Sequence, residues 1–208
     1  MKALILVDLQ NDFLPGGALA VAEGDQVVPV ANRVQSYFEL VVATQDWHPA
    51  EHASFAANHA GRRPGDTIEL AGLPQVLWPM HCVQHTPGAA FSAQLDLSRV
   101  AHVVRKGTDP QIDSYSGFFD NGRRKATELD AILKRHEVDD LFVLGLATDY
   151  CVKFTALDAR QLGYRTTLIV DACRGVNLQP GDVERAIDEM HRAGVHVVES
   201  GDLRAAKE

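Results

Sequence analysis

Several features are scarce in this sequence of 208 residues, and each absence narrows what the protein can be. Basic residues are outnumbered, 20 against 28 acidic ones, whereas a sequence-independent hold on nucleic acid needs clustered Lys and Arg. The three cysteines are far apart and form no CxxC pair, so a disulfide framework is not expected. The longest apolar run near the amino terminus, "ALILV", ends at Asp8 and is too short for a signal-peptide core or a membrane span. We therefore expect a cytoplasmic protein with no nucleic-acid partner and no membrane partner.

What the sequence does contain is enough apolar residues, 46% of the chain, for one substantial core. We expect a single domain over residues 1–208. Short apolar stretches recur, and they are continuous rather than alternating, which is typical of strands buried on both faces of a parallel sheet. Amphipathic segments at 123–138, 151–163 and 181–194 lie between them and are expected to be helices. The pattern predicts an α/β fold of three layers, α/β/α. The expected strands span residues 2–9, 40–47, 102–107, 140–147, 166–173 and 196–200.

One long region, from Pro49 to Arg99, does not follow this alternation. It is rich in His, Pro, Gly and Ala, and it has no long periodic segment, so we expect it to be loop. A loop of this length in a compact domain usually carries function. We therefore expect residues from about 48 to 100 to supply metal-binding and substrate-binding side chains.

Reactive side chains follow four of the expected strands. Asp8 follows the first strand, Asp46 and His48 end the second, Lys106 ends the third, and the segment 147–151 follows the fourth. In open α/β sheets, ligands bind beyond the carboxyl ends of the strands. We therefore expect these side chains to meet at one edge of the sheet.

Cys151 is the candidate nucleophile, because it begins the expected helix 151–163. A helix amino terminus favours a thiolate, but a thiol with a pKa of about 8.5 also needs a cation or a base nearby. Lys106 and Asp8 can supply both, and the backbone N–H groups of Ala147 and Cys151 can hold an oxyanion. The alternatives stay open at this point: a packed cysteine that caps a helix, an acid that caps a turn, and a surface lysine.

A metal site is the second hypothesis. Asp46 and His48 stand two residues apart on an extended segment and can face one cation, and His81 in "WPMHC" can complete an open site. Pro49 disfavours a helical backbone at His48, so His52 is expected to be an outer or additional ligand. The alternative is that these histidines are ordinary loop residues.

Three aromatic residues lie in expected loops near these candidates: Phe13, Trp78 and Tyr115. They are either lids on the core or stacking faces for a flat heteroaromatic substrate.

Over essentially its whole length the chain resembles the nicotinamidases, a metal-dependent branch of the isochorismatase-like family of cysteine hydrolases. The motifs that carry the resemblance are "ILVDLQNDF", "TQDWHP", "WPMHC", "RKGTDPQIDSYSGFFDN", "GLATDYCV" and "LIVDAC". Together they are specific, whereas "DLQNDF" alone would indicate only the wider family.

The resemblance implies a six-stranded isochorismatase-like fold with strand order 3-2-1-4-5-6 and a cis peptide between Leu146 and Ala147. It implies a catalytic triad of Asp8, Lys106 and Cys151, and one divalent cation (Zn, Fe or Mn) on Asp46, His48 and His81. The implied reaction is hydrolysis of nicotinamide to nicotinic acid and ammonia through a cysteine thioester, in NAD salvage, with pyrazinamide as a further small-molecule substrate. A homo-oligomer is compatible with the resemblance.

Three other functions compete with this one. A metal-independent amidohydrolase on the same scaffold would need only the triad. An isochorismatase-type ether hydrolase would not need Cys151. A catalytically silent metal-binding or interaction protein would be expected to have lost a triad position, and none is lost.

Overall fold

The computed structural model describes residues 1–203. Its central sheet contains six parallel strands: β1 (Lys2–Val7), β2 (Leu40–Asp46), β5 (Val100–Lys106), β6 (Asp140–Leu146), β7 (Arg165–Arg174) and β8 (His196–Val198). Their order across the sheet is β5-β2-β1-β6-β7-β8. Counted along the chain, this is the predicted order 3-2-1-4-5-6, so the predicted α/β topology is confirmed.

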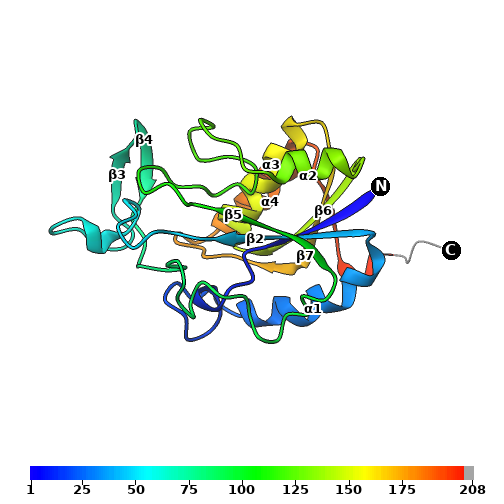
Figure 1. Ribbon diagram of the computed structural model, residues 1–208, viewed down its shortest axis with the longest axis horizontal. Helices are drawn as coiled ribbons and strands as arrows, with labels where there is room; N and C mark the ends of the chain where they lie inside the picture. Colours follow the sequence, from blue (N-terminus) through cyan, green and yellow to red (C-terminus); the bar gives the residue numbers. More distant parts are fainter. Residues whose placement is uncertain (204–208) are drawn as a thin grey trace.

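Four helices cover the sheet: α1 (Val27–Val34), α2 (Leu129–Arg135), α3 (Lys153–Gln161) and α4 (Asp182–Arg192). Figure 1 shows α1 on one side of the sheet and α2 and α3 on the other, which gives the three predicted layers. None of the helices in residues 1–203 is long and apolar enough to cross a bilayer. Short 3₁₀ turns lie at Asn11–Phe13, Gly24–Gln26, Gln35–Tyr37, Ala56–Asn58 and Ser200–Asp202, and a π-helical turn lies at Thr148–Val152.

Helix α1 has no counterpart among the sequence predictions. Its sequence "VVPVANRV" is rich in β-branched valine and contains Pro29, both of which lower helix propensity. Proline is nevertheless tolerated in the first turn of a helix, where its missing N–H costs no hydrogen bond. The buried residues Val27, Val28, Ala31 and Val34 have helical spacing and pack into the core. Burial of this face therefore outweighs the weak local propensity.

Burial along the strands follows their place in the sheet. In β1 every residue from Ala3 to Val7 is fully buried, as the continuous apolar run predicts. Strand β5 differs, because Val104 and Lys106 are buried whereas Val103 and Arg105 are exposed. The expectation of burial on both faces is wrong for this strand, since β5 lies at the edge of the sheet.

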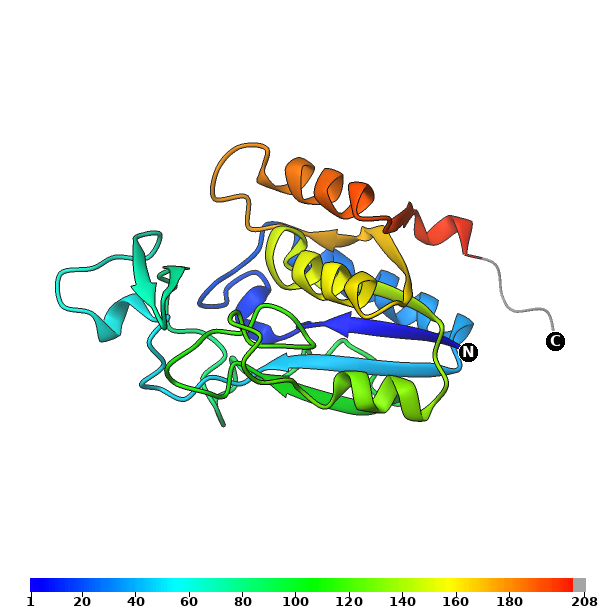
Figure 2. The same cartoon turned by 90° about the horizontal axis from the view of Figure 1, so that it is seen from above.

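The region expected to be loop contains a β-hairpin, which corrects that expectation. Strand β3 (Thr67–Leu70) pairs antiparallel with β4 (Leu73–Val76). The two connecting residues, Ala71 and Gly72, both have positive φ, as two-residue hairpin turns require. Alanine rarely adopts this conformation, so "AG" lacks the turn signal that Asn-Gly would have given. Figure 2 shows the hairpin beyond the end of the sheet toward which the strand arrows point.

Candidate active site

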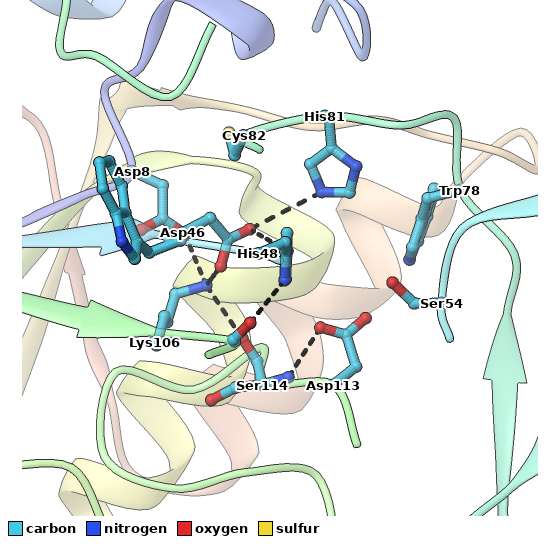
Figure 3. Close-up of polar contacts among 12 residues, drawn as sticks. Asp8, Asp46, His48, Ser54, Trp78, His81, Cys82, Lys106, Asp113 and Ser114 are labelled. Atoms are coloured by element: carbon cyan, nitrogen blue, oxygen red, sulfur yellow. Dashed lines mark hydrogen bonds and ion pairs between the residues drawn. The ribbon is translucent and has the colours of Figure 1, made fainter. Parts of the chain in front are cut away.

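Neighbouring strands bring three ionisable side chains to the carboxyl edge of the sheet. Asp46 ends β2 and lies beside Lys106, the last residue of β5, in the parallel register. Asp8 follows β1 directly, with a positive φ of 50° that turns its side chain at the strand end. All three residues are buried. The prediction that strand ends would gather these groups is therefore confirmed in its geometry (Figure 3).

The Lys106 ammonium group is the centre of this cluster. Its Nζ lies 2.5 Å from Asp46 Oδ1 and 2.9 Å from Asp8 Oδ2, and it donates to the Ser114 carbonyl oxygen at 3.0 Å. It also lies 3.3 Å from Cys151 Sγ. A surface role for Lys106, the alternative that the sequence left open, is therefore excluded.

Burial and the neighbouring opposite charges shift the pKa values of these three groups in opposite directions. Burial disfavours a charged lysine, but Asp46 and Asp8 outweigh it and hold the pKa of Lys106 well above its ordinary value. Burial likewise disfavours a charged Asp46, but Lys106 and His48 keep the pKa of this carboxyl well below its usual range. For Asp8, burial dominates and raises the pKa, although Lys106 opposes it. Of the two carboxylates, Asp8 is the better proton acceptor.

Cys151 reaches the cluster from the turn that follows β6. It lies in the π-helical turn Thr148–Val152, immediately before α3. The Ala147 carbonyl oxygen accepts hydrogen bonds from the N–H groups of Tyr150 and Val152, both at 3.1 Å, which closes this turn. The peptide between Leu146 and Ala147 is cis, as the resemblance implied. Ala147 and Cys151, the two residues expected to supply oxyanion donors, line the same narrow pocket.

The surroundings of Cys151 favour the neutral form of its thiol. Burial raises its pKa well above the ordinary value, Lys106 opposes this shift, and Asp8 and Asp46 reinforce it. The position before a helix predicts a stabilised thiolate, but burial, reinforced by the two carboxylates, outweighs this effect. The thiol therefore needs a group that takes its proton.

Asp8 is placed to take that proton. One oxygen each of Asp8 and Asp46 and the Sγ of Cys151 lie within 4.8 Å of one another. Asp8 Oδ1 accepts a hydrogen bond from Thr44 Oγ1 at 2.7 Å. Its buried Oδ2 forms the ion pair with Lys106 but accepts no well-aligned hydrogen bond from residues 1–203. This oxygen keeps a lone pair for a proton.

The second side of Asp46 faces two histidines. Asp46 Oδ2 lies 3.5 Å from His48 Nε2 and 3.8 Å from His81 Nε2. All three side chains are buried, and each contributes one atom to a group within 4.8 Å. A cation held at about 2.1 Å by each ligand places neighbouring donor atoms roughly 3–3.5 Å apart. The distances from Asp46 Oδ2 to the two Nε2 atoms, 3.5 and 3.8 Å, are at or slightly above this range. The three donor atoms are therefore close enough to hold one cation.

The orientation of both imidazoles supports ligation. His48 Nδ1 lies 2.8 Å from the Gly107 carbonyl oxygen, and His81 Nδ1 lies 2.8 Å from the Pro79 carbonyl oxygen. A carbonyl oxygen only accepts hydrogen bonds, so each Nδ1 carries the proton. In the neutral rings each Nε2 then offers a lone pair toward Asp46. Backbone carbonyls commonly fix metal-ligating histidines in this way.

His52 lies close to this group, with its ring centroid 4.4 Å from that of His48. Its Nδ1 lies 2.8 Å from Ser54 Oγ and 3.2 Å from the Ser54 nitrogen, and its buried Nε2 has no hydrogen-bond partner among residues 1–203. Burial lowers the pKa of His52 to about 4, which keeps the ring neutral. One atom each of His48, His52 and Asp113 also lies within 4.8 Å of the others. His52 therefore adjoins His48, and its role as an outer or additional ligand stays a prediction.

The three expected aromatic residues all line the narrow pocket at Cys151. Trp78 Nε1 donates to the Tyr115 hydroxyl at 3.1 Å, so these two rings are held together. Phe13 lies on another wall, with its ring centroid 5.5 Å from that of His81. The geometry agrees with a pocket for a flat ring.

Sequence reasoning missed several residues of this site. Tyr150 lines the pocket and contacts Trp78 edge-on at 4.9 Å, and Asp113 lines it as well. Gln75 of β4 donates to Asp113 Oδ2 and to the Tyr115 hydroxyl, both at 3.0 Å. The resemblance motif that includes Asp113 was available as a signal, but nothing in the sequence pairs it with Gln75.

Comparisons with known proteins agree with this geometry. The family model for the isochorismatase domain matches residues 2–202. The chain is 58% identical to the nicotinamidase of Escherichia coli (strain K12) over 197 residues, which are 93% of this chain and 92% of that protein. It superposes on a solved Acinetobacter baumanii nicotinamidase/pyrazinamidase with a TM-score of 0.95, at 47% identity and 98% coverage of both chains. It also superposes on a Pyrococcus horikoshii pyrazinamidase in complex with zinc, with a TM-score of 0.79, at 41% identity and 95% and 98% coverage.

Proposed function

The chain belongs to the isochorismatase family, and we propose that it is a nicotinamidase, an amide hydrolase that converts nicotinamide to nicotinic acid and ammonia. The observation that carries the proposal is the buried Lys106 ammonium group, which contacts Asp8, Asp46 and Cys151 at once. This cluster combines a nucleophile, a proton acceptor and a cation, as acyl transfer requires. The similarity to named nicotinamidases supports nicotinamide as the amide.

The first step is attack by Cys151 on the carboxamide carbon. The Sγ–carbon bond forms, the carbonyl π electrons move to oxygen, and the thiol proton passes to Asp8 Oδ2. Lys106 favours the negative charge on sulfur during this transfer, because its Nζ lies 3.3 Å from Sγ. The N–H groups of Ala147 and Cys151 then donate hydrogen bonds to the new oxyanion.

The second step expels ammonia. The oxyanion collapses, the carbon–nitrogen bond breaks, and Asp8 returns its proton to the departing nitrogen. A thioester with Cys151 remains. A water molecule attacks this thioester while Asp8 accepts a proton from it. Cleavage of the carbon–sulfur bond then releases nicotinic acid, and the proton held by Asp8 passes to Sγ and restores the thiol.

The metal site is assigned to Asp46, His48 and His81, which would hold one divalent cation, Zn, Fe or Mn. The support is the two Nε2 lone pairs directed at Asp46 Oδ2, together with the zinc-bound pyrazinamidase relative. When bound, the cation supplies a Lewis-acid partner for the pyridine nitrogen, which orients the ring relative to Cys151. His52 is kept as an outer or additional ligand, because its buried Nε2 has no hydrogen-bond partner among residues 1–203 and its ring adjoins that of His48.

The pocket walls fit a single aromatic ring. Phe13, Trp78 and Tyr115 provide flat faces around a narrow space that ends at Cys151. Pyrazinamide has the same carboxamide and one further ring nitrogen, so we include it among the substrates. A role in NAD salvage, a cytoplasmic location and a homo-oligomeric state stay predictions.

The test is ammonia release from nicotinamide by the purified protein. It is measured as isolated, after chelation, and after zinc, iron or manganese is restored. Release that falls on chelation and returns with a metal supports the complete proposal. Release that is indifferent to chelation would leave a metal-independent amidohydrolase. Absence of release with every metal, from folded protein that still carries a reactive Cys151, would reject nicotinamide as the substrate.

A further inference from the structure

The loop that follows β1 contains two polar side chains that the proposed reaction does not use. Gln10 and Asp12 alternate with Leu9, Asn11 and Phe13 in the segment after Asp8. Both point at the main chain of other segments rather than at the pocket. Each of those segments carries one residue of the Asp46, His48 and His81 group.

Gln10 holds the peptide groups of Asp46. Its side chain is fully buried. The Asp46 N–H donates to Gln10 Oε1 at 2.8 Å, and Gln10 Nε2 donates to the Asp46 carbonyl oxygen at 2.8 Å. Nε2 also donates to the Ala89 carbonyl oxygen at 2.9 Å. One carboxamide therefore fixes both sides of Asp46 and ties it to the loop at Ala89.

Asp12 holds the residue that follows His81. Asp12 Oδ2 accepts a hydrogen bond from the Cys82 N–H at 2.7 Å, and Oδ1 accepts one from the Ala18 N–H at 3.2 Å. Cys82 is buried and has a φ of 47°, a left-handed conformation that costs energy for any residue other than glycine. The Asp12 carboxylate stabilises this turn, and the turn sets where the His81 ring lies.

Gly88 shows how closely the chain approaches this carboxylate. A Cβ atom at Gly88 would lie 2.1 Å from Asp12 Oδ2 and 2.4 Å from Oδ1. The φ of Gly88 is not in the left-handed region. Alanine at this position would therefore displace the carboxylate without otherwise straining the backbone.

We propose that Gln10 and Asp12 are positioning residues that act through the main chain to hold Asp46 and His81 in the geometry of the cation site. The inference rests on the metal site assigned under the proposed function. Without these two side chains, Asp46 and His81 are fixed in position only when the cation binds. The free energy needed to fix them is then lost from the free energy of binding, so the cation binds more weakly. Loss of such outer contacts typically weakens metal affinity about 10- to 100-fold. Once the site is saturated with metal, kcat should largely recover.

The experiment measures the zinc dissociation constant of each metal-free variant by competition with a chelator of known affinity. Asp12→Ala, Gln10→Met and Gly88→Ala are each expected to weaken zinc binding about 10- to 100-fold. Asn11→Ala is the matched control. Asn11 Nδ2 donates to the Pro87 carbonyl oxygen at 2.8 Å, so it ties the same two loops together but contacts no metal-site segment. Its zinc affinity should equal that of the wild type.

Four outcomes separate the hypotheses. His81→Ala with unchanged zinc affinity would overturn the metal site itself, and the positioning inference with it. Weak binding by His81→Ala but normal binding by both Asp12→Ala and Gly88→Ala would overturn only the positioning role of Asp12. Normal binding by Gln10→Met would do the same for Gln10. Equal weakening in Asn11→Ala would show general loosening of the loop and would also reject the inference. Gly88→Ala keeps the aspartate at position 12 and only displaces its carboxylate. This variant therefore tests the hydrogen bond between Asp12 and Cys82 even where Asp12→Ala does not fold.

Discussion

The two halves of the site are built in different ways. One half stands on the sheet: Asp8, Asp46 and Lys106 end neighbouring strands, and Cys151 follows a fourth. We call these four residues the sheet-borne half. The other half lies on irregular segments beyond the sheet and is held by a few hydrogen bonds to the main chain or to neighbouring side chains. We call it the loop-borne half, and it consists of His48, Trp78, His81 and Tyr115.

This difference determines how each half fails. In the sheet-borne half the ladder of strand pairs fixes the backbone, and the buried charges compensate one another, so removal of one charge leaves the others unpaired. In the loop-borne half the positions of the side chains depend on local contacts, so a small displacement changes binding rather than chemistry. Substitutions in the sheet-borne half should therefore cause larger losses of activity and stability than substitutions in the loop-borne half.

The largest loss is expected for Cys151→Ala. Removal of a covalent nucleophile from a catalytic cluster should lower kcat by about 10⁴-fold or more, because no other group can form the thioester. The measurement is ammonia release from nicotinamide by the metal-loaded protein. Cys173→Ala is the matched control, because this thiol is also buried but donates to the Ile169 carbonyl oxygen at 3.3 Å and does not line the pocket at Cys151. Full activity of Cys151→Ala would remove the thioester from the mechanism.

The next largest effect is expected for Lys106→Met. Asp8 and Asp46 would lose their shared partner in a buried site, which should lower the free energy of unfolding by about 3–5 kcal/mol. Lys106 lowers the pKa of the Cys151 thiol, so its removal should raise that pKa further. Alkylation of Cys151 by iodoacetamide should then begin only at higher pH than in the wild type.

Lys153→Met is the control for this pH shift. Lys153 lies two residues after Cys151 in the chain, but its ammonium group pairs with Glu189 on the surface at 3.2 Å. Its removal should leave the pH profile of alkylation unchanged. An identical profile for Lys106→Met and Lys153→Met would mean that Lys106 does not tune the thiol.

The same division explains what the sequence could predict. Asp8, Asp46 and Lys106 were predictable, because a parallel sheet aligns its carboxyl ends and short apolar runs mark the strands. The strand order came instead from the resemblance of whole motifs, which also implied the ligand set that the spacing of Asp46, His48 and His81 had already indicated. Gln75 and the hairpin that carries it were not predictable, since the Ala71–Gly72 turn has no strong signal and the contact with Tyr115 joins segments 40 residues apart. Helix α1 was missed because burial rather than propensity stabilises it.

Gly107→Ala should displace the His48 ring in the loop-borne half without changing any charge. A Cβ atom at Gly107 would lie 2.3 Å from the His48 ring, and this backbone carbonyl also accepts from His48 Nδ1. The ring must move, so zinc affinity should fall about 10- to 100-fold. Gly61→Ala carries the same backbone strain, with a φ of 74°, but its Cβ would have no atom within 4 Å. Equal affinity in the two variants would show that the orientation of His48 does not limit metal binding.

The smallest of these effects is expected for Tyr115→Phe. Gln75 would keep its contacts with Val76 and Asp113, so the main loss is the acceptor for Trp78 Nε1. One buried donor left unpaired costs about 1–2 kcal/mol. If the Trp78 ring shifts as a result, the KM for nicotinamide should rise about fivefold while kcat changes little, because a fivefold change corresponds to about 1 kcal/mol.

Tyr164→Phe separates this effect on the pocket from a general loss of stability. The Tyr164 hydroxyl donates to Asp130 Oδ1 at 2.7 Å, and neither residue lines the pocket at Cys151. Both tyrosine variants should therefore unfold at a lower temperature than the wild type, but only Tyr115→Phe should change KM. If Tyr115→Phe instead lowers kcat and leaves KM unchanged, the hydroxyl stabilises the transition state more than the bound substrate. Tyr115 would then contribute to catalysis, as the sheet-borne half does, and not to substrate binding alone.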